Sequence, residues 1–135
     1  TIEVEPADDC PDAVFVEDTV VVYDDVAVIS RPGADERKPE TAGTEAALRD
    51  LGYRIERVEA PDTLDGGDVL KHDGTVWVGL GGRTTPGAVE QLRAHLAPLG
   101  YVVIHAPWYS TRCARSDRQT YKLQLSGCAT VVSNL

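Results

Sequence analysis

The stretch TVVVYDDVAVIS, residues 19–30, decides the fold of this chain. β-Branched residues fill both of its apolar runs, and Asp24-Asp25 separates the runs as a turn would. We therefore predict two strands joined in a hairpin. Downstream, apolar residues at helical spacing predict a helix over residues 40–52, and the alternating polar and apolar residues 53–58 predict a half-exposed strand.

The same order of elements returns later in the chain. Residues 69–79 contain two apolar runs separated by an Asp-Gly turn signal, residues 86–99 have helical spacing, and residues 101–104 form another strand-like run. We therefore predict two β-β-α-β units, at residues 19–58 and 69–104, and an α/β fold class. A unit that repeats in this way needs neighbours to bury its faces, so two units indicate a larger parent.

Two segments lie outside these units. Residues 13–16, Ala-Val-Phe-Val, form a short apolar run that predicts a further strand. After residue 107 the chain becomes locally basic and its apolar periodicity weakens. We predict one organised domain over residues 1–107 and a divergent tail over residues 108–135.

Composition argues against several classes of function. The net charge of −9 argues against a nucleic-acid partner, which requires clustered Lys and Arg. The apolar runs are too short for a membrane span, and the first residues do not resemble a signal peptide.

Three cysteines without a CxxC pair predict a cytoplasmic location and no zinc site. The chain contains no methionine, so we expect a processed or truncated start.

Acidic residues collect at two places beside the predicted strands. Asp12 precedes the first apolar run, and Glu17 and Asp18 follow it, whereas Asp65 and Asp68 enclose two glycines. Both groups have an ordinary explanation as solvated turn residues. Alternatively, the carboxylates face a cleft and pair with a planar cation such as a guanidinium, while the glycines let a ligand approach the main chain.

Two arginines occupy matching positions in the two units. Arg31 and Arg83 each follow the last strand of a predicted hairpin. An isolated arginine is usually a surface residue. The matching positions favour a second explanation, in which the two guanidinium groups clamp a carboxylate.

Four motifs, in order, resemble those of the dimethylarginine dimethylaminohydrolases. They are residues 12–18, which end in Phe-Val-Glu-Asp, Arg31-Pro32-Gly33-Ala34 followed by Arg37 and Glu40, residues 64–70 (LDGGDVL), and residues 78–80 followed by Arg83-Thr84. The third motif is the most specific. The resemblance covers roughly residues 10–104, and it is the order of the four motifs that makes it strong.

The resemblance implies a fold and a reaction. The family hydrolyses N-methylated arginines to citrulline and a methylamine, without a metal or cofactor. It is similar to arginine deiminases and amidinotransferases and shares their pentein fold, a propeller of five β-β-α-β blades around a central active site. This chain would be a fragment, a partial pentein α/β propeller of about two blades. Its partner would be a small-molecule substrate, methylated arginine.

The resemblance also assigns roles to individual residues. Asp18 and Asp65 would hold the substrate guanidinium, and Asp65 would be the acidic member of the catalytic set. Asp12 would contact the α-amino group, and Glu17 would support the pocket. Arg31 and Arg83 would bind the α-carboxylate.

The family's reaction further requires a cysteine thiolate and a histidine that acts as acid and base. Cys10, Cys113 and Cys128 do not match the position of the nucleophile, and His105 does not lie in the expected His-Leu-Lys segment. We therefore expect this chain to be inactive alone, as a truncated or altered product, a piece of a complex or a degenerate homologue. The alternatives are a non-catalytic module for arginine-like ligands, an arginine deiminase or amidinotransferase, and a fragment without function.

Overall fold

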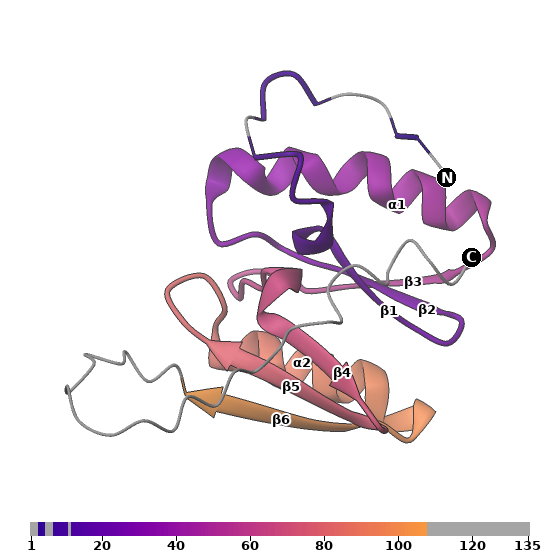
Figure 1. Cartoon of the computed structure of the whole chain (residues 1–135), viewed down its shortest axis with the longest axis vertical. Helices are drawn as coiled ribbons and strands as arrows, with labels where there is room; N and C mark the ends of the chain where they lie inside the picture. Colours follow the sequence, from indigo (N-terminus) through magenta and orange to yellow (C-terminus); the bar gives the residue numbers. More distant parts are fainter. Residues whose placement is uncertain (1–2, 5–6, 11, 108–135) are drawn as a thin grey trace, which may run out of the picture.

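A computed structural model describes residues 3–4, 7–10 and 12–107 (Figure 1). The first unit contains β1 (Val20–Tyr23), β2 (Val26–Ile29), α1 (Thr41–Asp50) and β3 (Arg54–Arg57). The second unit contains β4 (Val69–His72), β5 (Thr75–Leu80), α2 (Pro86–Leu96) and β6 (Val102–Pro107). Short 3₁₀ helices flank these elements: η1 (Val16–Asp18), η2 (Asp35–Glu40), η3 (Gly66–Asp68) and η4 (Ala97–Leu99). The two predicted β-β-α-β units are confirmed.

Each unit forms a three-stranded sheet of the same design. The sheet orders are β1-β2-β3 and β4-β5-β6, with the first pair antiparallel and the second pair parallel. The hairpins turn where predicted, and Asp24 and Asp73 adopt left-handed φ angles of 52° and 46°. Gly52 and Gly100, with φ of 89° and 84°, follow the two helical segments. A left-handed glycine at this position ends a helix without steric cost.

One hydrophobic core joins the two units. It contains valines of β1, β2, β5 and β6 together with Ala88, Val89, Leu92 and Leu96 of α2. The side-chain amide of Gln91, also on α2, donates a 3.1 Å hydrogen bond to the main-chain oxygen of Glu59, which follows β3. Helix α2 of the second unit therefore packs against both sheets. A smaller core lies between β1, β2 and α1.

Among the described residues, no helix packs on the opposite face of the second sheet. Trp77 on β5 pairs with Ile104 on β6, and the two residues are 43% and 37% exposed. Val102, two residues before Ile104 and thus on the same face, is 58% exposed. The second sheet therefore buries one face and presents an apolar surface on the other.

The predicted strand at residues 13–16 is wrong. Val14 lies in a turn, and η1 begins at Val16. The amide of Phe15 donates to the oxygen of Asp12 (2.9 Å) and that of Asp18 to the oxygen of Phe15 (3.0 Å), so main-chain hydrogen bonds close locally instead of pairing with a strand. The predicted tail, residues 108–135, lies outside the described residues. In the described part of the chain, no helix has the length and apolarity needed to cross a membrane.

Lys71, Tyr23 and Tyr101 form a cluster, here called the tyrosine–lysine clamp, that joins the two units. It lies at the ends of β1 and β4 that are remote from η1 and η3. Lys71 Nζ lies 5.0 Å from the ring centroid of each tyrosine. The two rings meet edge to face with centroids 5.1 Å apart. Both contacts are favourable, because a ring face attracts a cation and ring edges prefer ring faces.

Candidate functional site

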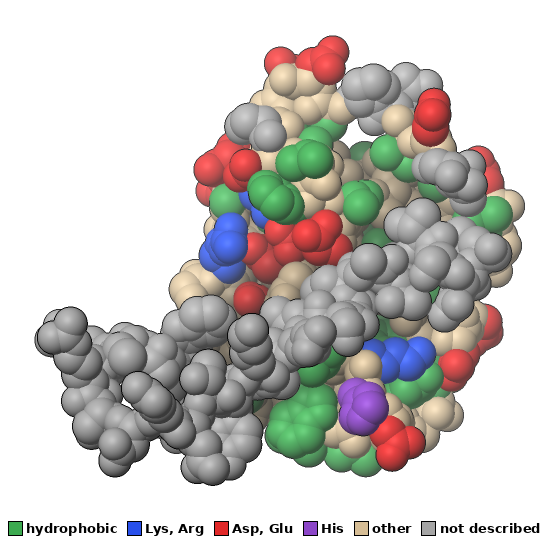
Figure 2. Space-filling model, in the orientation of Figure 1, with side chains coloured by type: hydrophobic (Ala, Val, Ile, Leu, Met, Phe, Trp, Pro, Cys, Tyr) green, Lys and Arg blue, Asp and Glu red, His purple; other side chains and the backbone are tan. Residues whose placement is uncertain are grey.

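The predicted acidic residues of the two units come together where η1 packs against η3. The main-chain amide of Gly67 donates a 2.9 Å hydrogen bond to Asp18 Oδ1. A Cβ on Gly66 would lie 2.2 Å from the main-chain oxygen of Glu17, and a Cβ on Gly67 would lie 2.4 Å from Asp18 Oδ1. The two glycines are therefore required by this close approach. Figure 2 shows Asp and Glu side chains gathered in the middle of this face, with Lys and Arg side chains beside them.

Asp18 is held by a buried arginine. Arg37 Nη1 lies 2.7 Å from Asp18 Oδ2, and the side chain of Arg37 is 3% exposed. Arg37 also donates hydrogen bonds to both carboxylate oxygens of Glu40, whose side chain is 2% exposed. The hydrogen bonds with Glu40, and then the one with Asp18, raise the pKa of the Arg37 guanidinium above its ordinary value despite burial. This network fixes Asp18 from the first unit.

Asp65 is buried at the start of η3. Its Oδ1 accepts a 3.1 Å hydrogen bond from the amide of Gly33, and Arg83 Nε lies 3.0 Å from its Oδ2. The Arg83 N–H is not aligned with Oδ2, which therefore has no hydrogen-bond partner among the described residues. Burial raises the pKa of the Asp65 carboxyl, and the nearby charges of Asp18 and Asp68 raise it further, against the lowering effects of Gly33 and Arg83.

Thr84 links Asp65 to Asp68. Its hydroxyl donates a 2.5 Å hydrogen bond to Asp68 Oδ2 and accepts a 3.2 Å hydrogen bond from the amide of Asp65. The Thr84 residue is 1% exposed. The backbone at Asp65 is therefore fixed from the second unit.

Arg31 and Arg83 make different contacts despite their matching positions. Arg31 Nη1 donates to the main-chain oxygens of Asp62 (2.9 Å) and Pro61 (3.4 Å). Arg83 faces the Asp65 carboxylate instead. The two loops are adjacent, since a Cβ on Gly33 would lie 2.7 Å from Arg83 Cα.

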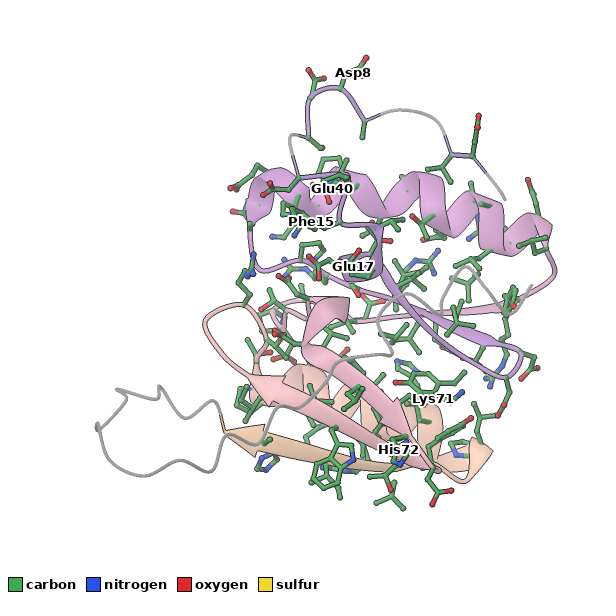
Figure 3. All side chains as sticks on the ribbon, viewed as in Figure 1. Asp8, Phe15, Glu17, Glu40, Lys71 and His72 are labelled. Atoms are coloured by element: carbon green, nitrogen blue, oxygen red, sulfur yellow. The ribbon has the colours of Figure 1, made fainter. Side chains whose placement is uncertain are left out.

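The remaining predicted residues line the same region. Asp12 is exposed, and its main-chain oxygen accepts a 3.2 Å hydrogen bond from Arg37 Nη2. Glu17 is partly exposed on η1, and Figure 3 shows it with Phe15 near the junction of the two units. The structure thus brings Asp18 and Asp65 together, with Asp12 and Glu17 on the segment that carries Asp18.

Arg37, Glu40 and Thr84 belong to the four motifs quoted above, but no role was predicted for them. The spacing of Arg37 and Glu40, three residues apart, was a usable signal because residues at that spacing meet on one side of a helix. Nothing in the sequence marked Thr84 as the hydrogen-bonded neighbour of Asp65, since that contact joins segments far apart in the chain.

The family's reaction requires a cysteine and a histidine, and the described residues include only one of the three cysteines. Cys10 is buried, and its Sγ lies 3.5 Å from the main-chain oxygen of Glu36. Cys113 and Cys128 lie outside the described residues, and His105 is exposed on β6. Within residues 3–4, 7–10 and 12–107, no group of three or more His, Cys, Asp or Glu side chains could hold a metal ion.

Sequence comparison places the chain among known proteins, although no family model matches it. Over 107 residues the chain is 58% identical to the N(G),N(G)-dimethylarginine dimethylaminohydrolase of Streptomyces coelicolor, covering 79% of this chain and 42% of that protein. This chain belongs to the dimethylarginine dimethylaminohydrolase family. The dimethylarginine dimethylaminohydrolase of Pseudomonas aeruginosa is 36% identical over 96 residues, which are 70% of this chain and 38% of that protein. The chain spans less than half the length of these two relatives.

Solved structures agree with this family. A cysteine-to-serine mutant of the Pseudomonas aeruginosa dimethylarginine dimethylaminohydrolase, complexed with citrulline, matches with a TM-score of 0.74 and 33% identity. The match covers 78% of this chain and 42% of that one. The N-terminal domain of ArgZ, a cyanobacterial arginine dihydrolase, matches with a TM-score of 0.70 at 23% identity over 77% of this chain and 38% of that one, which shows a common fold.

Proposed function

We propose that the complete enzyme hydrolyses N-methylated arginine to citrulline and a methylamine through a cysteine thiolate, and that this chain supplies much of its substrate-binding pocket. One observation carries the proposal: Asp18 and Asp65, from the segments that precede the two units, lie in one site with arginines beside them. Two carboxylates suit a planar guanidinium, which donates hydrogen bonds in a fork. The names of the relatives, and the citrulline bound to one of them, support the same substrate class.

We assign the residue roles that the family resemblance implies. Asp18 and Asp65 hold the guanidinium, while Asp12 contacts the α-amino group and Glu17 supports the pocket. Arg31 and Arg83 bind the α-carboxylate. Asp65 is the acidic catalytic residue, because a buried carboxyl with a raised pKa accepts a proton more readily than an exposed one.

The open face of the second sheet supports a larger propeller. In the first unit, the face of the sheet formed by Val21, Val26 and Val28 shares a core with α2 of the next unit. The exposed face of Trp77, Val102 and Ile104 lacks a matching helix among the described residues. A following unit would cover it in the same way, so we propose that the two units are blades of a five-bladed parent.

Calorimetry with asymmetric dimethylarginine tests the binding role. We expect the chain to bind the amino acid, and we expect Asp18→Asn to weaken binding by about tenfold or more, since a charge-assisted hydrogen bond contributes roughly 1.5–3 kcal/mol. Asp25→Asn, in the exposed turn between β1 and β2, removes the same charge away from the site and serves as the control. No binding at millimolar concentrations would contradict the proposal.

Citrulline release tests the catalytic role. The chain alone should release little or no citrulline, because the described residues offer Cys10 as a buried thiol directed at Glu36. Addition of the part of the Streptomyces relative that this chain does not match should restore release. Turnover that survives replacement of every cysteine would exclude the thiolate mechanism.

The buried position of Cys10 also favours a second candidate function, a non-catalytic module that binds arginine-like ligands. The same mixture separates the two. Ligand binding that never gains turnover on addition of the remainder favours the module, whereas restored citrulline release favours the hydrolase.

A further inference from the structure

Two residues that the proposed function assigns to opposite ends of the substrate contact each other. Arg83 Nε lies 3.0 Å from Asp65 Oδ2. Under the proposed function, Asp65 holds the substrate guanidinium and Arg83 holds the substrate carboxylate. A substrate guanidinium that binds Asp65 must therefore replace the guanidinium of Arg83.

The surroundings of Asp65 make this replacement specific to one oxygen. Gly33 donates its amide to Oδ1, which leaves Oδ2 to interact with a cation. Oδ2 is buried without a hydrogen-bond partner among the described residues, because the N–H of Arg83 is near but poorly aligned. A guanidinium that approaches with a better angle gains a hydrogen bond that Arg83 does not make.

Arg83 can leave Asp65 without movement of the main chain. Its Cα packs against Gly33, where a Cβ would lie 2.7 Å away, and the next residue, Thr84, is buried and hydrogen-bonded to Asp68. The Arg83 side chain itself is 60% exposed. Rotation of the side chain alone therefore frees the carboxylate.

The two other arginines beside the site, Arg37 and Arg31, are not free to exchange their partners. Arg37 is buried and donates to both Asp18 and Glu40, so its departure would leave two carboxylates without their cation. Arg31 is engaged by the main-chain oxygens of Pro61 and Asp62. Arg83 is the arginine whose partner is a predicted substrate ligand and whose side chain is largely in solvent.

We propose that Arg83 is a specificity-determining residue that occupies Asp65 and is exchanged for the substrate guanidinium, after which it binds the substrate carboxylate. A ligand with both groups compensates for the lost Arg83–Asp65 pair. A simple guanidinium cation offers Arg83 no new partner. Arg83 therefore selects guanidino amino acids over free guanidines. The inference rests on the proposed function, which places the guanidinium on Asp65.

Calorimetry on the full chain tests the exchange with two probes, N-methylguanidinium and Nω-methylarginine. We expect Arg83→Ala to bind N-methylguanidinium about twofold to fivefold more tightly, the factor equivalent to an exposed ion pair of roughly 0.5–1 kcal/mol. The same variant should bind Nω-methylarginine about tenfold or more weakly, since a charge-assisted hydrogen bond is lost. Arg31→Ala removes the same charge nearby and should show no gain for N-methylguanidinium.

A second measurement does not depend on any ligand. Carbon-13 NMR of the carboxyl groups should show a higher pKa for Asp65 in Arg83→Ala than in the wild type, because a neighbouring cation is removed. An unchanged pKa for Asp65, or an unchanged affinity for N-methylguanidinium, would overturn the exchange and leave the proposed function standing. If N-methylguanidinium responds as expected and Nω-methylarginine does not bind, a guanidinium still replaces Arg83 at Asp65, but binding of the substrate carboxylate by Arg83 and the proposed substrate are both wrong. If no variant binds either probe, both are wrong.

Discussion

The site contains two carboxylate–arginine pairs that are built in opposite ways. Asp18 and Arg37 form a buried pair, with side chains 15% and 3% exposed. Asp65 and Arg83 form a half-open pair, in which the carboxylate side chain is 3% exposed and the arginine 60% exposed. The buried pair is extended by Glu40, whereas Arg83 does not donate an aligned hydrogen bond to Asp65.

The difference separates structural support from ligand exchange. A buried arginine that satisfies two carboxylates cannot be removed without leaving uncompensated charge in the interior. An exposed arginine exchanges its partner for water at little cost. We interpret the Asp18–Arg37 pair as fixed support and the Asp65–Arg83 pair as the part of the site that responds to a ligand.

The largest expected effect concerns the buried pair. Arg37→Leu should lower the free energy of unfolding by about 3–5 kcal/mol, because it leaves Asp18 and Glu40 without a cation. Urea denaturation measures this change. Arg49→Leu is the matched control, since Arg49 is 60% exposed and pairs with Glu45 on the surface of α1. An equal effect of the two substitutions would remove the distinction between the pairs.

The next effect concerns the pH dependence contributed by Asp65. Its pKa is raised above the ordinary value of 3.8 in the folded chain. As pH rises past 3.8, the carboxyl therefore ionises first in the unfolded chain, and the folded state loses stability until its own pKa is passed. Asp65→Asn lacks this loss. Its free energy of unfolding should rise relative to the wild type between pH 3 and pH 7, as measured by urea denaturation across that range, and a constant difference would contradict the raised pKa.

The smallest effect is expected for the half-open pair. Arg83→Ala should change the free energy of unfolding by less than about 1 kcal/mol, because Arg83 is mostly exposed and water reaches Asp65 when it is removed. Thermal and urea denaturation both measure this. If Arg83→Ala lowered the free energy of unfolding as much as Arg37→Leu, Arg83 would be a structural residue, and the two pairs would not differ in function.

The elements of the fold were predictable where local signals and burial agree. The β1–β2 hairpin combines apolar strands with an Asp24-Asp25 turn, and all four residues of β2 are buried. Residues 13–16 looked similar in composition, but Phe15 is 49% exposed and Val14 is 77% exposed. An apolar run becomes a strand when a partner strand is available, and the sequence does not show which partners the fold provides.

The candidate site was predictable only in part, because the sequence shows which residues lie beside strands but not which loops lie opposite them. Asp12, Glu17, Asp18 and Asp65 were found as acidic residues beside strands, and the structure gathers them because equivalent ends of the two units meet. The equivalence of Arg31 and Arg83 in sequence did not extend to their contacts. Each arginine's partner depends on which loop lies opposite it: Pro61-Asp62 for one and Asp65 for the other.

The tyrosine–lysine clamp provides a spectroscopic signal that reports whether the two units are in contact. β1 begins two residues after Asp18 and ends at Tyr23, and β4 begins directly after Asp68 and contains Lys71 near its other end, so the clamp and the site lie at opposite ends of these strands. A ring pair held edge to face in a fixed environment contributes to the near-ultraviolet circular dichroism of tyrosine, and separation of the units would abolish that contribution. Ligand titrations followed at this wavelength would therefore distinguish local rearrangement around Asp65 from parting of the two units.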